Sequence, residues 1–472
     1  MGRQLGKMLV SAGIVTEQQL HEGLERQRIH KGKLGDNLEA LGYVQDSDLV
    51  RLLRQIPPPP VRVEDTGLEL SFIADLVTKH IVFMSEFTLV DVEERIKLPA
   101  SIVDASVEML RRGKIVEVLS AEGYATSTYR FRITELGRKR AQDLLDICRY
   151  VGPAPVPLDV YHTMVVTQSI NGIPLDEGVL RKAYSHLVIE DNFFSRLGPA
   201  IASGKSLFMY GPSGNGKTAL AENIKAMLPD TILIPYAIIV MGQIVNIFDP
   251  VTHELAETGY PPDELDQRWV VTKRPVVVVG GELTARMLDL DFNSIAKYYE
   301  APLQMKANNG LFIIDDFGRQ QIEPRAFLNR WIFPLEKRVD FINLHTGIKI
   351  QIPFDLFVIF ATNLEPAELV DEAFLRRIRY KIKVDRPSTE QFEAIFRKVC
   401  DRNGIAFEPQ VFERLMGHYR KSGVKLAACH PRDIVDHIID NSRYKHRGVR
   451  MTEEAIDAAW ENYFVEPGQH NA

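Results

Sequence analysis

The chain has 472 residues, of which 45% are hydrophobic and 25% charged, with a formal net charge of −6. This composition predicts an ordinary globular protein of about three domains, and the small negative charge excludes a global attraction to nucleic acid or anionic membranes. There is no apolar run long enough to span a membrane, no secretory signal and no cysteine spacing suited to a metal, so we expect a cytoplasmic protein without membrane insertion.

Residues 1–56 contain two similar units, each with a Leu-Gly pair, a second glycine and spaced leucines. The shared positions are Leu5, Gly6, Leu9 and Gly13 in the first unit and Leu34, Gly35, Leu38 and Gly42 in the second. Each unit predicts a short helix, a glycine turn and a second helix capped by Thr16 or Asp46. We therefore expect a small α-helical repeat domain.

This repeat resembles the N-terminal domain of type II secretion and type IV pilus assembly ATPases, some of which bind cyclic di-GMP. The Lys-Leu-Gly at 33–35 and Gln27 match the family motif. Two positions depart from it: Arg3 lies one residue too far from the Leu-Gly pair at 5–6, and Gln55 comes one residue early. Cyclic di-GMP is thus a candidate ligand, and a ligand-free protein–protein module is the alternative.

Four prolines at 57–60 predict a stiff spacer before the next domain, residues 66–150. That domain is predicted to contain three helices, two strands joined by a turn, and a closing helix, at 70–80, 88–98, 101–112, 115–118, 129–133 and from 134 onward. The order resembles a winged helix, an α+β fold that commonly binds DNA.

The third helix of this domain argues against DNA binding. Its buried stripe leaves Asp104 and Glu108 on the outward face, where phosphates would repel them. A protein-interaction or spacer role is therefore favoured, and DNA binding stays open as the alternative.

A second Pro-rich linker, 152–157, leads to a strand at 206–210, a glycine-rich segment at 211–218 and a helix at 218–228. The segment fits the phosphate-loop pattern G-x-x-x-x-G-K-[ST] at every fixed position. Such a loop turns backbone N–H groups onto a phosphate, while the lysine reaches the β- and γ-phosphates and the threonine hydroxyl binds Mg²⁺. The candidate ligands of a nucleoside triphosphate are Gly211, Ser213, Gly214, Asn215, Gly216, Lys217 and Thr218. Upstream, Leu187 and Ile189 are candidates to lie over adenine, with plain core packing as the alternative.

Two further buried strands end in polar residues. The strand at 311–316 ends in Asp315, placed to hold Mg²⁺ through water, and Asp316, a candidate general base. The strand at 357–363 ends in Asn363, whose amide could orient the attacking water. Arginines follow at 376–377, and Arg432 lies in the first turn of a helix starting at 430.

Together these motifs resemble the AAA+ superfamily: Walker A, Walker B, sensor 1, arginine finger and sensor 2, in that order. The resemblance implies an α/β P-loop core over 160–385 with an α-helical lid over 386–465, ATP and Mg²⁺ as ligands, and a homo-oligomer, expected to be a hexamer. It also implies residue roles: Asp315 on the Mg²⁺ side, Asn363 as sensor 1, Arg377 as the finger with Arg376 beside it, and Arg432 as sensor 2.

Two features point to a subgroup. Strand-like runs at 339–344 and 348–352 resemble a hairpin that some members carry before sensor 1. Tyr298 and Tyr299 resemble the helix-2 insert region of MoxR-like ATPases, where they would be candidate substrate contacts, with packing as the alternative.

One residue departs from the family. Most members have Glu where this chain has Asp316, which is one methylene shorter, so we expect slow turnover or a bridging water. The leading interpretation is an AAA+ ATPase that remodels a protein partner, regulated by cyclic di-GMP and linked to secretion or pilus systems. The alternatives are a slow nucleotide-gated assembly switch and a DNA-directed motor.

Overall fold

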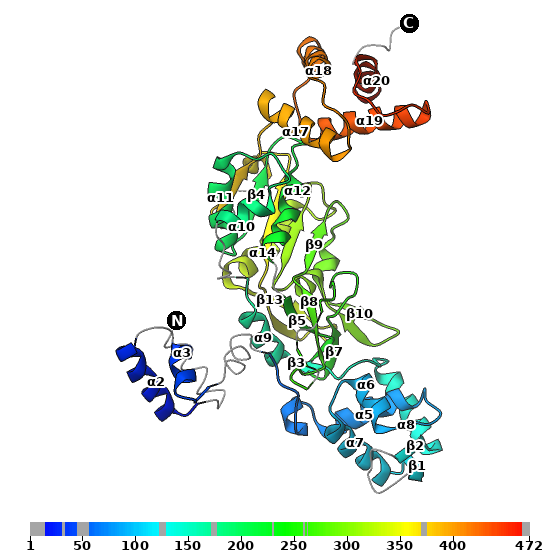
Figure 1. Ribbon diagram of the computed structural model, residues 1–472. Helices are drawn as coiled ribbons and strands as arrows, with labels where there is room; N and C mark the ends of the chain where they lie inside the picture. Colours follow the sequence, from blue (N-terminus) through cyan, green and yellow to red (C-terminus); the bar gives the residue numbers. More distant parts are fainter. Residues whose placement is uncertain are drawn as a thin grey trace.

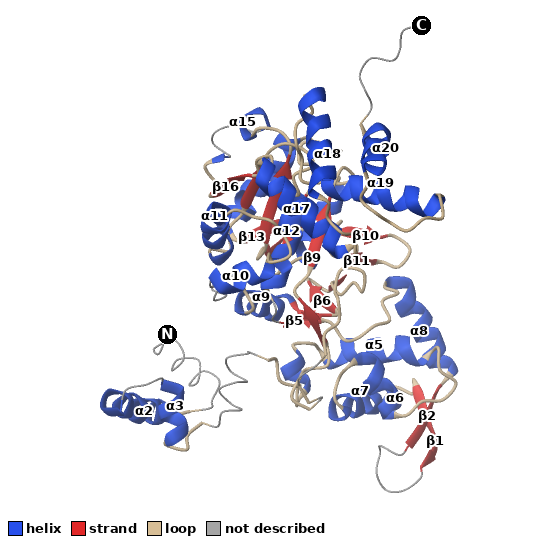
Figure 2. Ribbon diagram, turned by 45° about the horizontal axis from the view of Figure 1, so that its top comes forward, coloured by secondary structure: helices blue, strands red, loops and turns tan. Residues whose placement is uncertain are grey.

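The computed structural model describes residues 15–30, 34–44, 56–121, 129–170, 177–228, 231–257, 260–261, 263–369 and 375–464. The chain is elongated, with the C-terminal helices near one end and the helices of residues 70–147 at the other (Figures 1 and 2). A parallel α/β core and a separate β-rich module lie between them.

Helices α2 (Glu17–His30) and α3 (Leu34–Ala40) pack around a small core of Val15, Leu34, Leu38 and Val44. The predicted Thr16 cap is present: the Gln19 N–H donates to Thr16 Oγ1 at 3.2 Å. Several positions of the ligand motif lie outside the described residues: Arg3, the first residue of the 33–35 run, and Gln55. The predicted cap Asp46 lies outside them too. Cyclic di-GMP binding therefore stays a hypothesis.

The next module follows the predicted element order. Its elements are η1 (Val63–Thr66), α5 (Leu70–Ile81), α6 (Leu89–Ile96), α7 (Ala100–Arg112), β1 (Val116–Ala121), β2 (Tyr129–Ile133) and α8 (Glu135–Ile147). On α7, the Glu108 carboxylate accepts hydrogen bonds from Arg111 and Arg112, which lower the pKa of Glu108 to about 2. The basic end of α7 is therefore already paired within the helix. The predicted turn at Gly123 lies outside the described residues.

The α/β core is a parallel sheet in the order β16-β4-β15-β12-β9, from Tyr380–Lys383, Leu207–Tyr210, Phe357–Thr362, Leu311–Ile314 and Val276–Val279. Helices α10 (Glu177–Ala183), α11 (Asp191–Ala202) and α12 (Lys217–Glu222) pack on one face, and α14 (Pro324–Lys337) on the other. Central strands buried on both faces are expected to be apolar, and β12 and β15 are so up to Ile314 and Ala361. The helix predicted over 218–228 is shorter: it changes after Glu222 to the 3-10 segment η3 (Asn223–Met227), where Asn223 Nδ2 donates to Ala183 O at 2.8 Å.

A second hydrophobic core, not anticipated from the sequence, lies within and beside the segment that leads from η3 to β12. Its five-stranded sheet has the order β10-β11-β7-β6-β3, and an antiparallel pair β5-β8 and helices α9 and α13 complete it. The bounds are β3 Val156–Pro157, α9 Leu158–Thr167, β5 Thr231–Pro235, β6 Ala237–Val240, β7 Gln243–Asn246, β8 Trp269–Lys273, η4 Ala285–Leu288, β10 Asp291–Asn293, β11 Tyr298–Glu300 and α13 Leu303–Lys306. Residues 152–157, predicted to be a linker, thus end in a sheet strand. We call this unit the β module.

The hairpin predicted before sensor 1 is confirmed as β13 (Val339–Asn343) and β14 (Lys349–Pro353), paired antiparallel. Tyr299, however, is 1% exposed and its hydroxyl bonds to His345 at the hairpin turn, while Tyr298 packs edge-on against Tyr150. Tyr299 is therefore a packing residue, the alternative stated for it, whereas the substrate contact expected of the partly exposed Tyr298 stays a prediction.

A buried ion pair in the β module hydrogen-bonds to the proline run and to the first residues of the α5–α8 module. Arg268 and Asp266 are each 4% exposed in their side chains and lie 2.8 Å apart. Arg268 Nη1 also donates to Thr66 O and Pro155 O, and the Asp266 N–H donates to Pro57 O. The proline run and the α5–α8 module are thereby held on the β module.

Four helices form the C-terminal unit around its own core: α17 (Thr389–Arg402), α18 (Pro409–Ser422), α19 (His430–Tyr444) and α20 (Glu453–Tyr463). Short helix α15 (Pro366–Leu369) precedes it in the core. None of the described helices has the length and apolarity needed to cross a membrane.

We predict that Arg268→Met destabilises the chain by about 3–5 kcal/mol, because it leaves the Asp266 carboxylate buried without its partner. Differential scanning calorimetry measures the effect. The matched control is Arg286→Met, whose ion pair with Asp291 is exposed and should contribute about 1 kcal/mol or less. Equal effects of the two variants would contradict the prediction.

Candidate functional site

The glycine-rich segment 211–218 directly follows β4 and leads into α12, which begins at Lys217. Gly211 has φ +139°, and a Cβ there would lie 2.2 Å from Val384 O, so only glycine fits between β4 and β16. The loop is therefore fixed by its backbone at the C-terminal edge of the sheet.

Lys217 is 8% exposed, and its side chain lies against the backbone of this loop. Its Nζ donates to Gly211 O at 2.9 Å and to Pro212 O at 3.0 Å. Burial lowers the pKa of Lys217, and the nearby carboxylates of Asp316 and Asp315 act in the opposite direction. The ammonium group thus lies where the loop and the acid pair meet.

Thr218 and Asp315 are brought together from distant parts of the chain. Thr218 Oγ1 donates to Asp315 Oδ2 at 2.8 Å, and Asp315 follows β12 directly. A hydroxyl and a carboxylate oxygen are the hard ligands that Mg²⁺ prefers, and Mg²⁺ in nucleotide sites uses only one or two protein ligands besides phosphate and water. These two residues therefore fit the Mg²⁺ role expected from the sequence.

Asp316 lies in a tightly held turn. It is exposed and has φ +46°, a left-handed backbone conformation uncommon for a residue with a side chain. Gln320 Nε2 donates to Asp315 O at 2.8 Å and to Asp316 O at 3.3 Å. The Phe317 N–H donates to Ala361 O at 2.7 Å, which ties the turn to β15.

Asn363 follows the last residue of β15, which lies between β4 and β12. The register pairs Thr362 with Tyr210 and Phe360 with Ile314. Asn363 therefore lies at the same sheet edge as the phosphate loop and the acid pair, as its predicted role requires.

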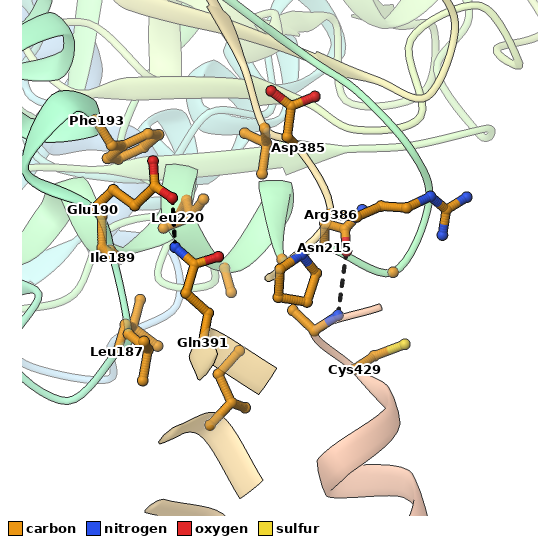
Figure 3. Close-up of a pocket in the computed structure, with 18 of the residues that line it drawn as sticks. Leu187, Ile189, Glu190, Phe193, Asn215, Leu220, Asp385, Arg386, Gln391 and Cys429 are labelled. Carbon is orange, nitrogen blue, oxygen red and sulfur yellow. Dashed lines mark hydrogen bonds between the residues drawn. The ribbon is translucent and has the colours of Figure 1, made fainter. Parts of the chain in front are cut away.

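A cavity of about 640 Å³ opens between the core and the C-terminal helices, beside the phosphate loop. Of the residues singled out from the sequence, it is lined by Leu187, Ile189, Gly214, Asn215, Gly216, Thr218 and Arg432. Figure 3 shows Leu187, Ile189 and Phe193 on one side of this cavity and Asn215, Arg386 and Cys429 on the other. Six basic side chains line it, Arg196, Lys383, Arg386, Lys398, Arg402 and Arg432, against two acidic ones, Glu190 and Asp385.

Helix α17 reaches across one wall of the cavity. Lys398 Nζ donates to Ser185 O and to Leu187 O, each at 2.9 Å, and Gln391 Nε2 donates to Glu190 Oε1 at 2.7 Å. Sequence analysis missed these residues because a lysine and a glutamine on an amphipathic helix carry no motif. They hold the segment that carries Leu187 against helix α17.

The two candidate finger arginines do not line this cavity. Arg377 Nε pairs with Glu336 Oε1 on α14 at 2.6 Å, and Arg376 is exposed beside it. Arg432, in contrast, lines the cavity and pairs with its neighbour Asp433 at 2.9 Å. Arg432 therefore lies at the cavity beside the phosphate loop, whereas Arg376 and Arg377 are not among the residues that line it.

The chain resembles known proteins in two respects: a sequence family matches its C-terminal helices, and its fold has distant neighbours among solved structures. The family described as "Domain of unknown function (DUF8689)" matches residues 388–462, which form α17–α20. No curated protein matches the chain in sequence. Among solved structures, a mutant of RuvB from Thermotoga maritima is 12% identical with a TM-score of 0.37, covering 58% of this chain and 69% of that one. The FIGL-1 AAA domain in complex with ADP is 13% identical with a TM-score of 0.31, covering 64% and 85%.

Scores this low assign nothing by themselves, so the fold rests on the chain's own geometry. The loop at 211–218 follows β4, Asp315 and Asp316 follow β12, and Asn363 follows β15, which lies between those two strands. This arrangement on the parallel order β16-β4-β15-β12-β9 gives the chain an α/β core with the glycine-rich loop, the acid pair and Asn363 at one edge of the sheet.

We predict that Asp316→Asn lowers the turnover of ATP by roughly 100-fold or more, the usual contribution of a general base. Asp316→Glu should give no gain, because the turn is held through its backbone by Gln320 and Ala361, so the longer side chain would carry the carboxylate past the position that Asp316 gives it. Steady-state ATPase assays of both variants, with ATP binding measured in parallel, test this. Near-normal turnover in the Asn variant would show that Asp316 is not the base.

Proposed function

We propose that this chain binds ATP with Mg²⁺ and hydrolyses it as an AAA+ ATPase. The observation that carries the proposal is the 2.8 Å hydrogen bond between Thr218 and Asp315 at the phosphate loop, with the Lys217 ammonium beside the same acid pair. A hydroxyl, a carboxylate and a buried cation at one loop are what binding a Mg²⁺-triphosphate requires.

The neighbouring cavity supports a nucleoside ligand. Its volume of about 640 Å³ is in the range of small-molecule and cofactor sites. Apolar side chains lie at the Leu187 end and the phosphate loop at the other, so base and phosphates would extend along it. The excess of basic side chains in its lining favours a polyanion.

The chemistry proposed for hydrolysis assigns a role to each residue. Lys217 and the loop N–H groups would hold the phosphates, and Mg²⁺, held by Thr218 and by Asp315 through water, would neutralise the developing charge. Asp316 would take the proton of the attacking water, which Asn363 would orient.

We further propose that the chain acts as a homo-oligomer, expected to be a hexamer. This rests on the resemblance of Arg376 and Arg377 to an arginine finger, and their exposure on the surface is compatible with contact to a neighbouring chain.

Remodelling of a protein partner is the leading extension of this function. Exposed apolar side chains on the α5–α8 module, Phe83, Met109, Val118 and Leu136, suit contacts with protein. The pairing of Arg111 and Arg112 with Glu108 disfavours the DNA-directed motor, because these cations are already satisfied within α7. Regulation by cyclic di-GMP and a secretion or pilus link stay proposals from the N-terminal resemblance.

A slow nucleotide-gated switch is the second candidate. It is favoured by Asp316, whose carboxylate is one methylene shorter than Glu and which lies on a turn held by Gln320. Turnover stimulated by a protein partner favours remodelling, whereas low turnover with ATP-dependent assembly favours the switch.

We expect Lys217→Ala to weaken ATP binding by roughly 10- to 100-fold or more, because it removes charge-assisted hydrogen bonds to the phosphates, and to abolish turnover. Equilibrium binding of a fluorescent ATP analogue and an ATPase assay measure both effects. Lys225→Ala, an exposed lysine in the same segment, is the matched control. Unchanged binding and turnover in Lys217→Ala would overturn the proposed function.

For Arg377→Ala we expect near-normal ATP binding and turnover lower by on the order of a thousandfold, as for the loss of an arginine finger. Glu336→Gln breaks the same ion pair but keeps the arginine, so its turnover should stay close to wild type. Mixing Arg377→Ala with Lys217→Ala should restore part of the activity, since each chain supplies what the other lacks. A monomer with ATP and no restoration in the mixture would contradict the finger.

A further inference from the structure

The phosphate loop is hydrogen-bonded to the residues directly before helix α19, which begins at His430. The Cys429 N–H donates to Gly214 O at 2.9 Å, and the Ala428 N–H donates to Asn215 Oδ1 at 3.2 Å. Figure 3 shows the second of these bonds crossing from the loop to the start of the helix. Residues more than 200 positions apart in the sequence therefore form one hydrogen-bonded junction.

Asn215 is the centre of this junction. It is 5% exposed, and its Nδ2 donates back to Pro212 O at 3.1 Å while its Oδ1 accepts from the lid. Both ends of the amide are thus used at once, one on the loop and one on the lid. The phosphate-loop pattern leaves this position open, so phosphate binding alone does not explain an amide here.

The junction is also closely packed. A Cβ at Gly214 would lie 2.8 Å from Cys429 Sγ and 3.4 Å from the Cβ of Ala427. On the other side, Arg386 Nη1 donates to Leu426 O at 3.2 Å. Residues 427–429 are therefore in direct contact with the loop at Gly214 and Asn215.

We propose that Asn215 is a positioning residue that couples the shape of the phosphate loop to the lid and thereby sets Arg432 at the phosphates. Arg432 lies in the first turn of α19, four residues after the amide that Asn215 binds. Ala428 lies just before α19, whose N-cap Cys429 accepts a hydrogen bond from the Asp433 N–H at 3.1 Å, so a shift at this end of the helix carries Arg432 with it. The kinetic part of this inference rests on the proposed ATPase function, whereas the junction itself does not.

The junction is tested first without nucleotide, by hydrogen exchange of the full chain. Asn215→Ala removes the acceptor of the Ala428 amide, so exchange in a peptide covering 424–433 should become roughly two- to tenfold faster. Peptides from α18 should be unchanged, which shows that the lid remains folded. Gln410→Ala, an exposed amide on the same lid, is the matched control and should leave both regions unchanged. Unchanged exchange at 424–433 in Asn215→Ala would overturn the proposal.

The positioning role is tested by a double-mutant cycle in ATP turnover. Asn215→Ala alone should lower kcat by roughly tenfold, and its further effect should largely vanish in an Arg432→Ala background, because the residue it places is already gone. A purely structural role for Asn215 would give equal effects in both backgrounds, and that result overturns the inference. If the wild-type chain fails to bind ATP, the proposed function fails while the exchange experiment still decides the junction.

Discussion

The parallel register of β4, β15 and β12 is the constraint on which the site depends. β15 hydrogen-bonds to β4 on one side and β12 on the other, so their carboxyl ends reach the same edge of the sheet. The register is held by aromatic packing on the sheet face, where Phe208 stacks on Phe360 at 5.9 Å. A slip of one residue would turn these buried side chains to the opposite face and separate Thr218 from Asp315. Core packing and site chemistry are therefore set by the same contacts.

A separate hydrophobic core joins the α5–α8 module to the β module and limits how these two units can move. Ala237 and Ile244 of the β module share one hydrophobic core with Ile73 and Val103 of the α5–α8 module. The buried Arg268–Asp266 pair adds polar contacts between the same units, and leaving either charge unpaired would be costly. A domain that could act as a separate recruiting arm thus moves with the β module. A motion that starts at the phosphate loop would therefore reach the α5–α8 module only through the contacts between the β module and the parallel sheet.

The sequence was sufficient for the elements with strong periodicity or fixed motifs. It placed the strands before Asp315 and Asn363, the phosphate loop, the α5–α8 order and the hairpin at 339–353. It did not reveal the β module, because its strands are short and several pair with residues distant in sequence, as Val156 does with Ile238. The same limit explains Tyr299: whether an aromatic faces solvent depends on a partner, His345, that no local pattern indicates.

The strained backbone of the turn at Asp316 determines where the Asp316 carboxylate can lie. A left-handed conformation in a residue with a side chain costs on the order of 1–2 kcal/mol, so other contacts must hold it. Those contacts are present: Gln320 binds two carbonyls of the turn, and Thr362 Oγ1 donates to Phe317 O at 2.7 Å. Because the backbone is fixed from both sides, the reach of the carboxylate is set by its own length and rotamer rather than by loop motion. In the proposed mechanism, a short acid on a fixed turn would serve as a base only if the water were brought to it, so Asn363, at the same sheet edge, would have a larger share in positioning that water.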